Sequence, residues 1–150
     1  MDLILWRHAD AQSGEPDVAR ELTPRGIKQA TRIAKWLEPR LPGSCRIIVS
    51  PATRAQQTAL ALERKFKTKD ELATGVEPES ILAAAKWPDS RETVLVVGHQ
   101  PTLGRVAALL VAGQDAEWWI PKGAIWWLSK REKSSGPGVV VRAVMEPDLM

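Results

Sequence analysis

The sequence has little of what secreted and membrane proteins depend on. Cys45 is the single cysteine among 150 residues, which excludes an internal disulfide framework. No apolar stretch approaches the roughly 20 residues that a membrane-spanning helix needs. The start, MDLILWRHAD, lacks the basic leader and small-residue cleavage site of a signal peptide. These absences lead us to expect a cytoplasmic protein without a membrane partner.

The chain also lacks a strong excess of charge of one sign. Its formal net charge is +3, and basic residues are mixed with acidic ones, as in residues 63–71. Nucleic-acid-binding domains instead carry a basic stripe or patch, so we expect no nucleic-acid partner. A slight positive excess suits a phosphorylated or acidic substrate, because it raises the encounter rate with anions.

The length and composition that remain are those of an ordinary soluble protein. With 44% hydrophobic and 26% charged residues, residues 1–150 are expected to form one compact domain, and we expect a monomer. Short apolar runs at 3–6, 47–49 and 93–97 predict buried strands. They alternate with stretches of helical periodicity, which indicates an α/β fold around a largely parallel sheet.

The stretches between these strands carry apolar residues at helical spacing. Each of two such sets follows a capping residue and a proline, Thr23-Pro24 for the first and Ser50-Pro51 for the second. The first set is Ile27, Ala30, Ala34, Leu37 and Leu41, and the second is Ala55, Ala59, Leu62 and Phe66. Further helices are predicted from about 101 to 112 and from 78 to the Trp87-Pro88 pair. Residues 124–129 and 139–144 predict a hairpin joined by a loop over 130–138.

Aromatic residues are few, and their kinds are unusual: seven are tryptophan and none is tyrosine. If the pairs Trp118-Trp119 and Trp126-Trp127 lie on strands, each must expose one ring, because side chains alternate along a strand. The exposed rings could form a partner-docking face. We favour the interpretation that the rings cover a sheet edge or form core.

Histidine is scarce as well, and the two residues present occupy equivalent places. His8 follows the strand predicted at 3–6, and His99 follows the strand predicted at 93–97. Ligands of open α/β sheets bind outside the carboxyl ends of the strands, so both imidazoles should face one crevice. Either histidine alone could simply cap its strand through a satisfied hydrogen bond. Both together favour a functional site.

Arginines point to the same crevice. Arg7 precedes His8, and Arg54 lies at the start of the helix that follows the strand at 47–49. Helix N-termini attract anions, and guanidinium groups bind phosphate through paired hydrogen bonds. Any one arginine could be a solvated surface charge. Three strand-to-helix junctions that all carry histidine or arginine favour an anion site.

Four motifs, in order, resemble those of the histidine phosphatase superfamily. LWRHADA at 5–11 is similar to the Arg-His-Gly signature, and SPATRAQQTA at 50–59 to the Ser-Pro-x-x-Arg-x-x-Gln-Thr-Ala segment. LTPRG at 22–26 and VVGHQP at 96–101 match the Leu-Thr-x-x-Gly turn and the second histidine motif. The short length makes the chain similar to the SixA-type phosphohistidine phosphatases. The resemblance implies a phosphoglycerate-mutase-like fold, a three-layer αβα sandwich.

The resemblance also implies roles for individual residues. His8 would be the nucleophile, with Arg7, Arg54 and His99 around the transferring phosphoryl group. Arg20 matches a basic residue that SixA-type proteins place near the phosphate, although it could lie in solvent, and Asp17 could position it. Ala9 departs from the family's glycine, which would strain any backbone with positive φ.

The chemistry of these side chains agrees with those roles. A histidine attacks phosphorus only through an unprotonated nitrogen, and neighbouring arginines lower its pKa by disfavouring the cation. Arginines and a protonated or donating His99 would match the charge on the phosphoryl oxygens. No cofactor is required. A metal site is disfavoured, because no HxH or HExxH spacing exists and adjacent arginines repel a cation.

Three functions remain open at this point. The first is hydrolysis of phosphohistidine on a protein through a phosphorylated His8, and the second is hydrolysis of small phosphomonoesters. An ester needs a general acid; Glu77 and Glu79 lie in the right region but are better explained as surface residues at a helix start. The third is a noncatalytic module that binds phosphate or a phosphoprotein. Binding alone would need only the arginines, so the two histidines argue against it.

Cys45 has no histidine motif beside it and is interpreted as a small buried residue.

Overall fold

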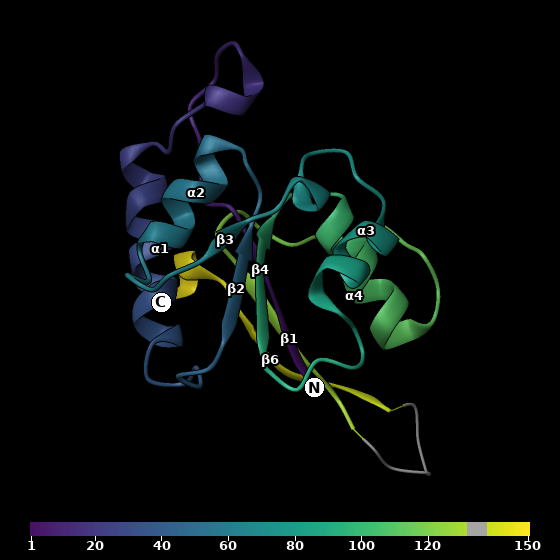
Figure 1. Ribbon diagram of the computed structural model, residues 1–150. Coiled ribbons are helices and arrows are strands. Elements are labelled where there is room, and N and C mark those ends of the chain that lie inside the picture. Colours follow the sequence, from purple (N-terminus) through teal and green to yellow (C-terminus); the bar gives the residue numbers. More distant parts are fainter. Residues whose placement is uncertain (132–137) are drawn as a thin grey trace.

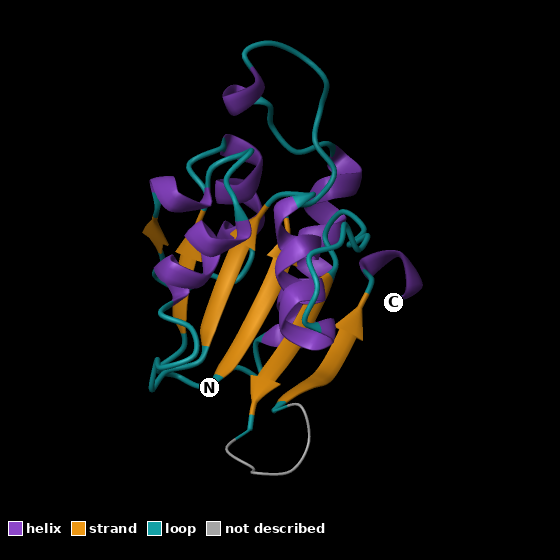
Figure 2. Cartoon of the chain, turned by 90° about the vertical axis from the view of Figure 1, so that its right-hand side faces the viewer, coloured by secondary structure: helices purple, strands orange, loops and turns teal. Residues whose placement is uncertain are grey.

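The computed structural model describes residues 1–131 and 138–150, and its centre is a twisted sheet (Figures 1 and 2). Within these residues the strands follow the order β3-β2-β4-β1-β5-β6. Their bounds are β1 Asp2–Arg7, β2 Arg46–Val49, β3 Lys67–Thr68, β4 Val94–Gly98, β5 Ile125–Lys130 and β6 Val139–Met145. The neighbours from β3 to β1 pair in parallel, whereas β5 pairs antiparallel with both β1 and β6. The predicted mostly parallel sheet is therefore confirmed.

Helices cover both faces of the sheet (Figure 1). On one side lie α1 (Pro24–Leu37) and α2 (Thr53–Leu60), and on the other lie α3 (Pro78–Ala85) and α4 (Thr102–Ala112). Short 3-10 turns complete the chain: η1 Asp17–Ala19, η2 Asp70–Leu72 and η3 Pro147–Leu149. In β1, Ile4 and Trp6 pack toward α1 and α2, and Leu3 and Leu5 toward α3 and α4. The three-layer prediction is confirmed.

The local sequence explains where the helices begin and end. Thr23 caps α1, because its side chain accepts a hydrogen bond from the backbone N–H of Gly26, and Pro24 takes the first helical position. A side chain at Gly26 would collide with the backbone carbonyl of Asp10, which explains the glycine of this turn. Gly113 ends α4 with φ of 73°, a conformation that glycine adopts without strain.

Several expectations about the elements are wrong. The helix after Ser50-Pro51 begins at Thr53 without a side-chain cap and ends at Leu60, so Phe66 lies outside it. Ile27 is 57% exposed and does not join the core. Trp118 and Trp119 lie outside the strands, so the alternation argument does not apply to them, and Trp119 is exposed rather than part of the core. Trp126 and Trp127 lie on β5 and both are largely covered, because helices protect both faces of the sheet. For these two rings the exposure expected from alternation is wrong, and the favoured interpretation as core is confirmed.

Other expectations are confirmed. The three buried strands, the helices at 78–85 and 102–112 and the antiparallel pair β5 and β6 lie within about two residues of their predicted bounds. Part of the loop predicted over 130–138 lies outside the described residues. None of the described helices is both long and apolar enough to cross a membrane.

The sheet order positions the candidate site. Strand β4 lies between β1 and β2, and the pairs Arg7 with Gly98 and Val49 with Val97 align their carboxyl ends. The residues that directly follow these strands, His8, Ser50 and His99, therefore meet at one edge of the sheet. A loop over residues 11–22, which carries η1, projects from the body above this edge (Figure 2).

Candidate active site

His8 is buried and held by backbone hydrogen bonds on two sides. Its N–H donates to the carbonyl of Gly98 at 3.0 Å, and its carbonyl accepts from the N–H of Gly123 at 3.0 Å. The ring nitrogen Nδ1 lies 2.8 Å from the carbonyl oxygen of Ala9. Because a carbonyl only accepts, Nδ1 carries the ring proton. The lone pair of the neutral imidazole is therefore on Nε2.

His99 lies beside His8, with 5.2 Å between the ring centroids. Its Nε2 is 2.7 Å from Oγ of Ser50, and this oxygen accepts a hydrogen bond from the backbone N–H of Ala52. The hydroxyl proton of Ser50 is then free to be donated to Nε2. This contact fixes the orientation of the His99 ring, with Nδ1 on the side away from Ser50.

Both imidazoles are neutral at physiological pH. Burial lowers the pKa of His8 to about 4, the positive charges of Arg54, Arg7 and Arg20 add to the shift, and the hydrogen bond to Ala9 opposes it. Burial also lowers the pKa of His99 to about 3, with further contributions from His8 and Arg54. The expectation that neighbouring arginines lower the pKa of His8 is confirmed, although burial contributes more. His99 is neutral rather than protonated.

Arg54 is the second residue of α2, and its side chain is only 4% exposed. Its Nε donates to Nε2 of His8 at 3.4 Å, and its two terminal nitrogens contact the carbonyl and the carboxylate of Asp17 at 2.9 and 3.2 Å. The other carboxylate oxygen of Asp17 accepts from Nε of Arg20 at 3.0 Å. Asp17 therefore joins the two arginines, and Arg20 is not free in solvent.

Arg7 ends strand β1, and its side chain contacts the segment that precedes β5. Its Nη1 donates to the carbonyl of Ile120 at 2.9 Å, and its guanidinium lies 4.9 Å from the centre of the Trp119 ring. Among the described residues, the buried side-chain polar atoms without a hydrogen-bond partner are Nε of Arg7 and Nδ1 of His99. An unpaired buried N–H is unfavourable by about 1–3 kcal/mol. A bound oxyanion would offer the acceptors that these groups lack.

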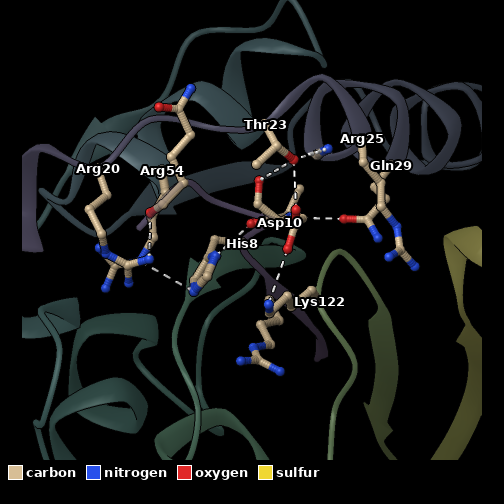
Figure 3. A network of polar contacts seen from close by, with 12 residues as sticks. His8, Asp10, Arg20, Thr23, Arg25, Gln29, Arg54 and Lys122 are labelled. Carbon is tan, nitrogen blue, oxygen red and sulfur yellow. Dashed lines mark hydrogen bonds and ion pairs between the residues drawn. The ribbon is translucent and has the colours of Figure 1, made fainter. Parts of the chain in front are cut away.

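The segment after His8 is held by a separate polar network (Figure 3). The carboxylate of Asp10 accepts hydrogen bonds from the hydroxyl of Thr23 at 2.7 Å and from Nζ of Lys122 at 3.1 Å. The backbone N–H of Asp10 donates to Gln29 at 2.9 Å. Ala9 is fully buried and is not among the described non-glycine residues with positive φ. The alanine therefore introduces no backbone strain.

Two buried hydroxyls were missed as site residues, although both lie in the quoted motif SPATRAQQTA. One is Ser50, which contacts His99. The other is Thr58, whose Oγ1 accepts from the N–H of Ala9 at 3.0 Å and donates to the carbonyl of Arg54 at 2.7 Å. The motif itself was the available signal, because small hydroxyl side chains beside a buried strand end need partners.

The remaining candidates lie elsewhere. Glu77 forms an ion pair with Arg105 at 3.0 Å, and Glu79 lies exposed in the first turn of α3. Burial raises the pKa of the Cys45 thiol to about 11, which keeps it protonated. Within residues 1–131 and 138–150, no group of three or more histidine, cysteine, aspartate or glutamate side chains is placed to hold a metal ion.

Comparison with known proteins connects this geometry to a family. The model of the histidine phosphatase superfamily (branch 1) matches residues 3–77. The phosphohistidine phosphatase SixA homolog of Haemophilus influenzae is 31% identical over 126 residues, which cover 73% of this chain and 77% of the relative. Phosphohistidine phosphatase SixA of Escherichia coli is 30% identical over 123 residues, which cover 76% of each chain.

Solved structures share the fold as well. A structure assigned to SixA from Nakamurella multipartitia superimposes with a TM-score of 0.81 and 30% identity, and covers 97% of this chain and 95% of its own. The predicted phosphoglycerate-mutase-like fold is confirmed by this likeness. Because the family model spans half of the sequence and relatives of 30% identity or more cover about three quarters of it, the chain belongs to the histidine phosphatase superfamily (branch 1).

Proposed function

We propose that this phosphatase removes the phosphoryl group from phosphohistidine on a protein, with His8 as the covalent carrier and without a metal ion. The observation that carries the proposal is the state of His8. Its Nδ1 proton is held by the carbonyl of Ala9 and its pKa is lowered to about 4. Nε2 is therefore unprotonated at neutral pH, and within the described part of the chain its lone pair is engaged only by the long hydrogen bond of 3.4 Å from Nε of Arg54.

The reaction proceeds in two transfers. The Nε2 lone pair of His8 attacks phosphorus, and the bond between phosphorus and the substrate imidazole breaks. The substrate ring, which carries a proton on its other nitrogen, keeps the electron pair and leaves as neutral imidazole. Water then attacks the phosphorus on His8, the bond to Nε2 breaks, and Nε2 regains its lone pair as inorganic phosphate and a proton are released. Each step exchanges one bond to phosphorus for another, so no oxidant or reductant is needed.

The surrounding groups would stabilise the phosphoryl oxygens. Arg54, Arg7 and Nδ1 of His99 offer donors that are already in place before the substrate arrives, and preorganised donors of this kind lower the barrier most effectively. Arg20 supports Arg54 through Asp17. Positive charge on this scale repels a metal cation, which supports a metal-independent reaction. A module that only binds phosphate would not need the neutral, oriented His8.

The leaving group supports phosphohistidine over an ester. The conjugate acid of imidazole has a pKa near 6.5, whereas that of an alkoxide is close to the value of about 15.7 for water. Imidazole can leave almost unaided, but an alkoxide needs a general acid. Glu77 is paired with Arg105 and Glu79 is exposed, so neither carboxyl is arranged to supply that acid. The names of the SixA relatives point to the same substrate class.

The test compares kcat/KM for a protein carrying one phosphohistidine with that for a phosphoserine peptide. The difference of roughly nine pKa units corresponds to about 12 kcal/mol at full charge development, and even a fraction of it separates the two substrates by orders of magnitude. We expect the phosphohistidine protein to be strongly preferred. Equal or better activity on the phosphoserine peptide would overturn the proposal in favour of small phosphomonoesters.

A further inference from the structure

Trp119 is held in an exposed position at the edge of the candidate site. Its side chain is 68% exposed, yet the carbonyls on both sides of it are fixed. The carbonyl of Trp118 accepts from Nε2 of Gln100 at 2.8 Å, and that of the fully buried Ile120 accepts from Arg7 at 2.9 Å. The backbone is thus anchored on both sides of a large ring that is left in solvent over the Arg7 guanidinium.

A second exposed apolar side chain lies on the other side of the site. Val18 is 53% exposed and follows Asp17, the residue that contacts Arg54 and Arg20. It is part of η1, on the loop that projects above the sheet edge (Figure 2). The contacts of Asp17 with the buried Arg54 fix this turn beside α2. Val18 and Trp119 therefore flank the anion site from the α2 side and from the β1 side.

We propose that Val18 and Trp119 dock the protein that carries the phosphohistidine, an inference that rests on the proposed function. The arginines and His99 match the anionic phosphoryl group on that protein's surface. The two apolar side chains would contact the surface around it, because burying an exposed tryptophan and valine against a partner is favourable in proportion to the apolar area covered. A ring whose backbone is already anchored on both sides loses less conformational freedom on binding than one on a free loop.

The choice of occupant follows from the spread of the two residues. Val18 lines a hollow beside Ser50, whereas Trp119 lines a different one beside Asp10, so a single phosphorylated amino acid in the anion site would not need both. A folded surface that presents a phosphohistidine spans the whole rim. The docking residues should therefore matter for a protein substrate and much less for a free amino acid.

The experiment measures kcat/KM for two probes: a folded phosphotransfer domain carrying one phosphohistidine, and the free amino acid phosphohistidine. The ratio of the two values is compared among the wild type, Val18→Ser, Trp119→Ser and the double variant. Leu60→Ser is the matched control, since Leu60 is a similarly exposed apolar residue, at 61%, at the end of α2 away from the site. Trp119→Phe tests whether an aromatic ring suffices.

We expect the ratio to fall at least tenfold in the double variant, to fall less in each single variant, and to stay within twofold of the wild type in Leu60→Ser. Trp119→Phe should retain most of the wild-type ratio. If activity on both probes falls in parallel, so that the ratio is constant, Trp119 acts by positioning Arg7 and the docking proposal is wrong. A wild type that hydrolyses neither probe would instead overturn the proposed function itself.

Discussion

Thr58 couples the two groups that must act together in the candidate site. Its buried hydroxyl accepts from the N–H of Ala9, whose carbonyl holds the Nδ1 proton of His8, and donates to the carbonyl of Arg54. One side chain thus sets the position of the segment that carries His8 relative to helix α2. A small shift between the two would misalign attack on phosphorus, to which catalysis is sensitive.

Replacing Thr58 by valine keeps the shape of the side chain and removes both hydrogen bonds. The N–H of Ala9 would then be buried without a partner, so we expect the free energy of unfolding to fall by about 1–3 kcal/mol and kcat to fall more than KM changes. Urea unfolding and steady-state kinetics measure the two effects. Thr58→Ser, which keeps the hydroxyl, is the control, and its stability and kcat should fall much less. A Thr58→Val protein with wild-type kcat would contradict this role.

The lowered pKa values of the two histidines are open to direct measurement, because the chain has no other imidazole. In NMR titrations of the native protein, His8 should titrate near pH 4 and His99 near pH 3, whereas in the urea-unfolded chain both should titrate near 6.5. Between pH 6.5 and 4 the unfolded chain then binds more protons, so the free energy of unfolding should decrease as the pH falls through this window. His99→Asn assigns the remaining signal to His8. A native histidine that titrates near 6.5 would contradict the burial argument.

Helix α4 supports the site through the segment that precedes β5. The carbonyl of Trp118 approaches Gly104 so closely that a side chain there would collide with it, and Gln100 binds the same carbonyl. Two residues further along, Ile120 binds Arg7. The absence of a side chain at one position of α4 therefore lets this segment reach Arg7.

The variant Gly104→Ala tests this packing. Alanine stabilises a helix relative to glycine by about 1 kcal/mol, but the collision with the backbone of Trp118 costs about 1–3 kcal/mol. We therefore expect the variant to be less stable than the wild type. We also expect a lower kcat, because Ile120 would shift away from Arg7. The melting temperature and kcat are the measurements. Gly43→Ala is the control, because a side chain at Gly43 meets no atom within 4 Å. A Gly104→Ala protein that is more stable and fully active would show that the contact is unimportant.

The elements show where sequence patterns are sufficient and where they are not. Leu62 and Phe66 pack against the same core as α2, as their spacing indicates, but the chain reaches those positions through a non-helical turn with φ of 55° at Glu63. Apolar spacing predicts burial more reliably than it predicts backbone conformation. Likewise, alternation along β5 could not predict the burial of both Trp126 and Trp127, because that depends on helices on both faces.

At the level of the whole molecule, the sheet topology accounts for what the sequence could predict of the site. His8, Arg54 and His99 directly follow parallel strands or begin the next helix, so an α/β pattern is enough to bring them together. The links from Asp17 to Arg54 and from Ile120 to Arg7 span 37 and 113 residues. They join segments without a local signature, and only the folded chain reveals them.

The central claim is that His8 carries the phosphoryl group during turnover. The most direct test mixes the protein with a phosphohistidine protein, stops the reaction within the first turnover, and locates phosphate on the chain by mass spectrometry. We expect an acid-labile phosphate on His8, with none on His99, and loss of turnover in His8→Ala. A His8→Ala protein with near-normal turnover, or a first turnover without phosphate on His8, would contradict it.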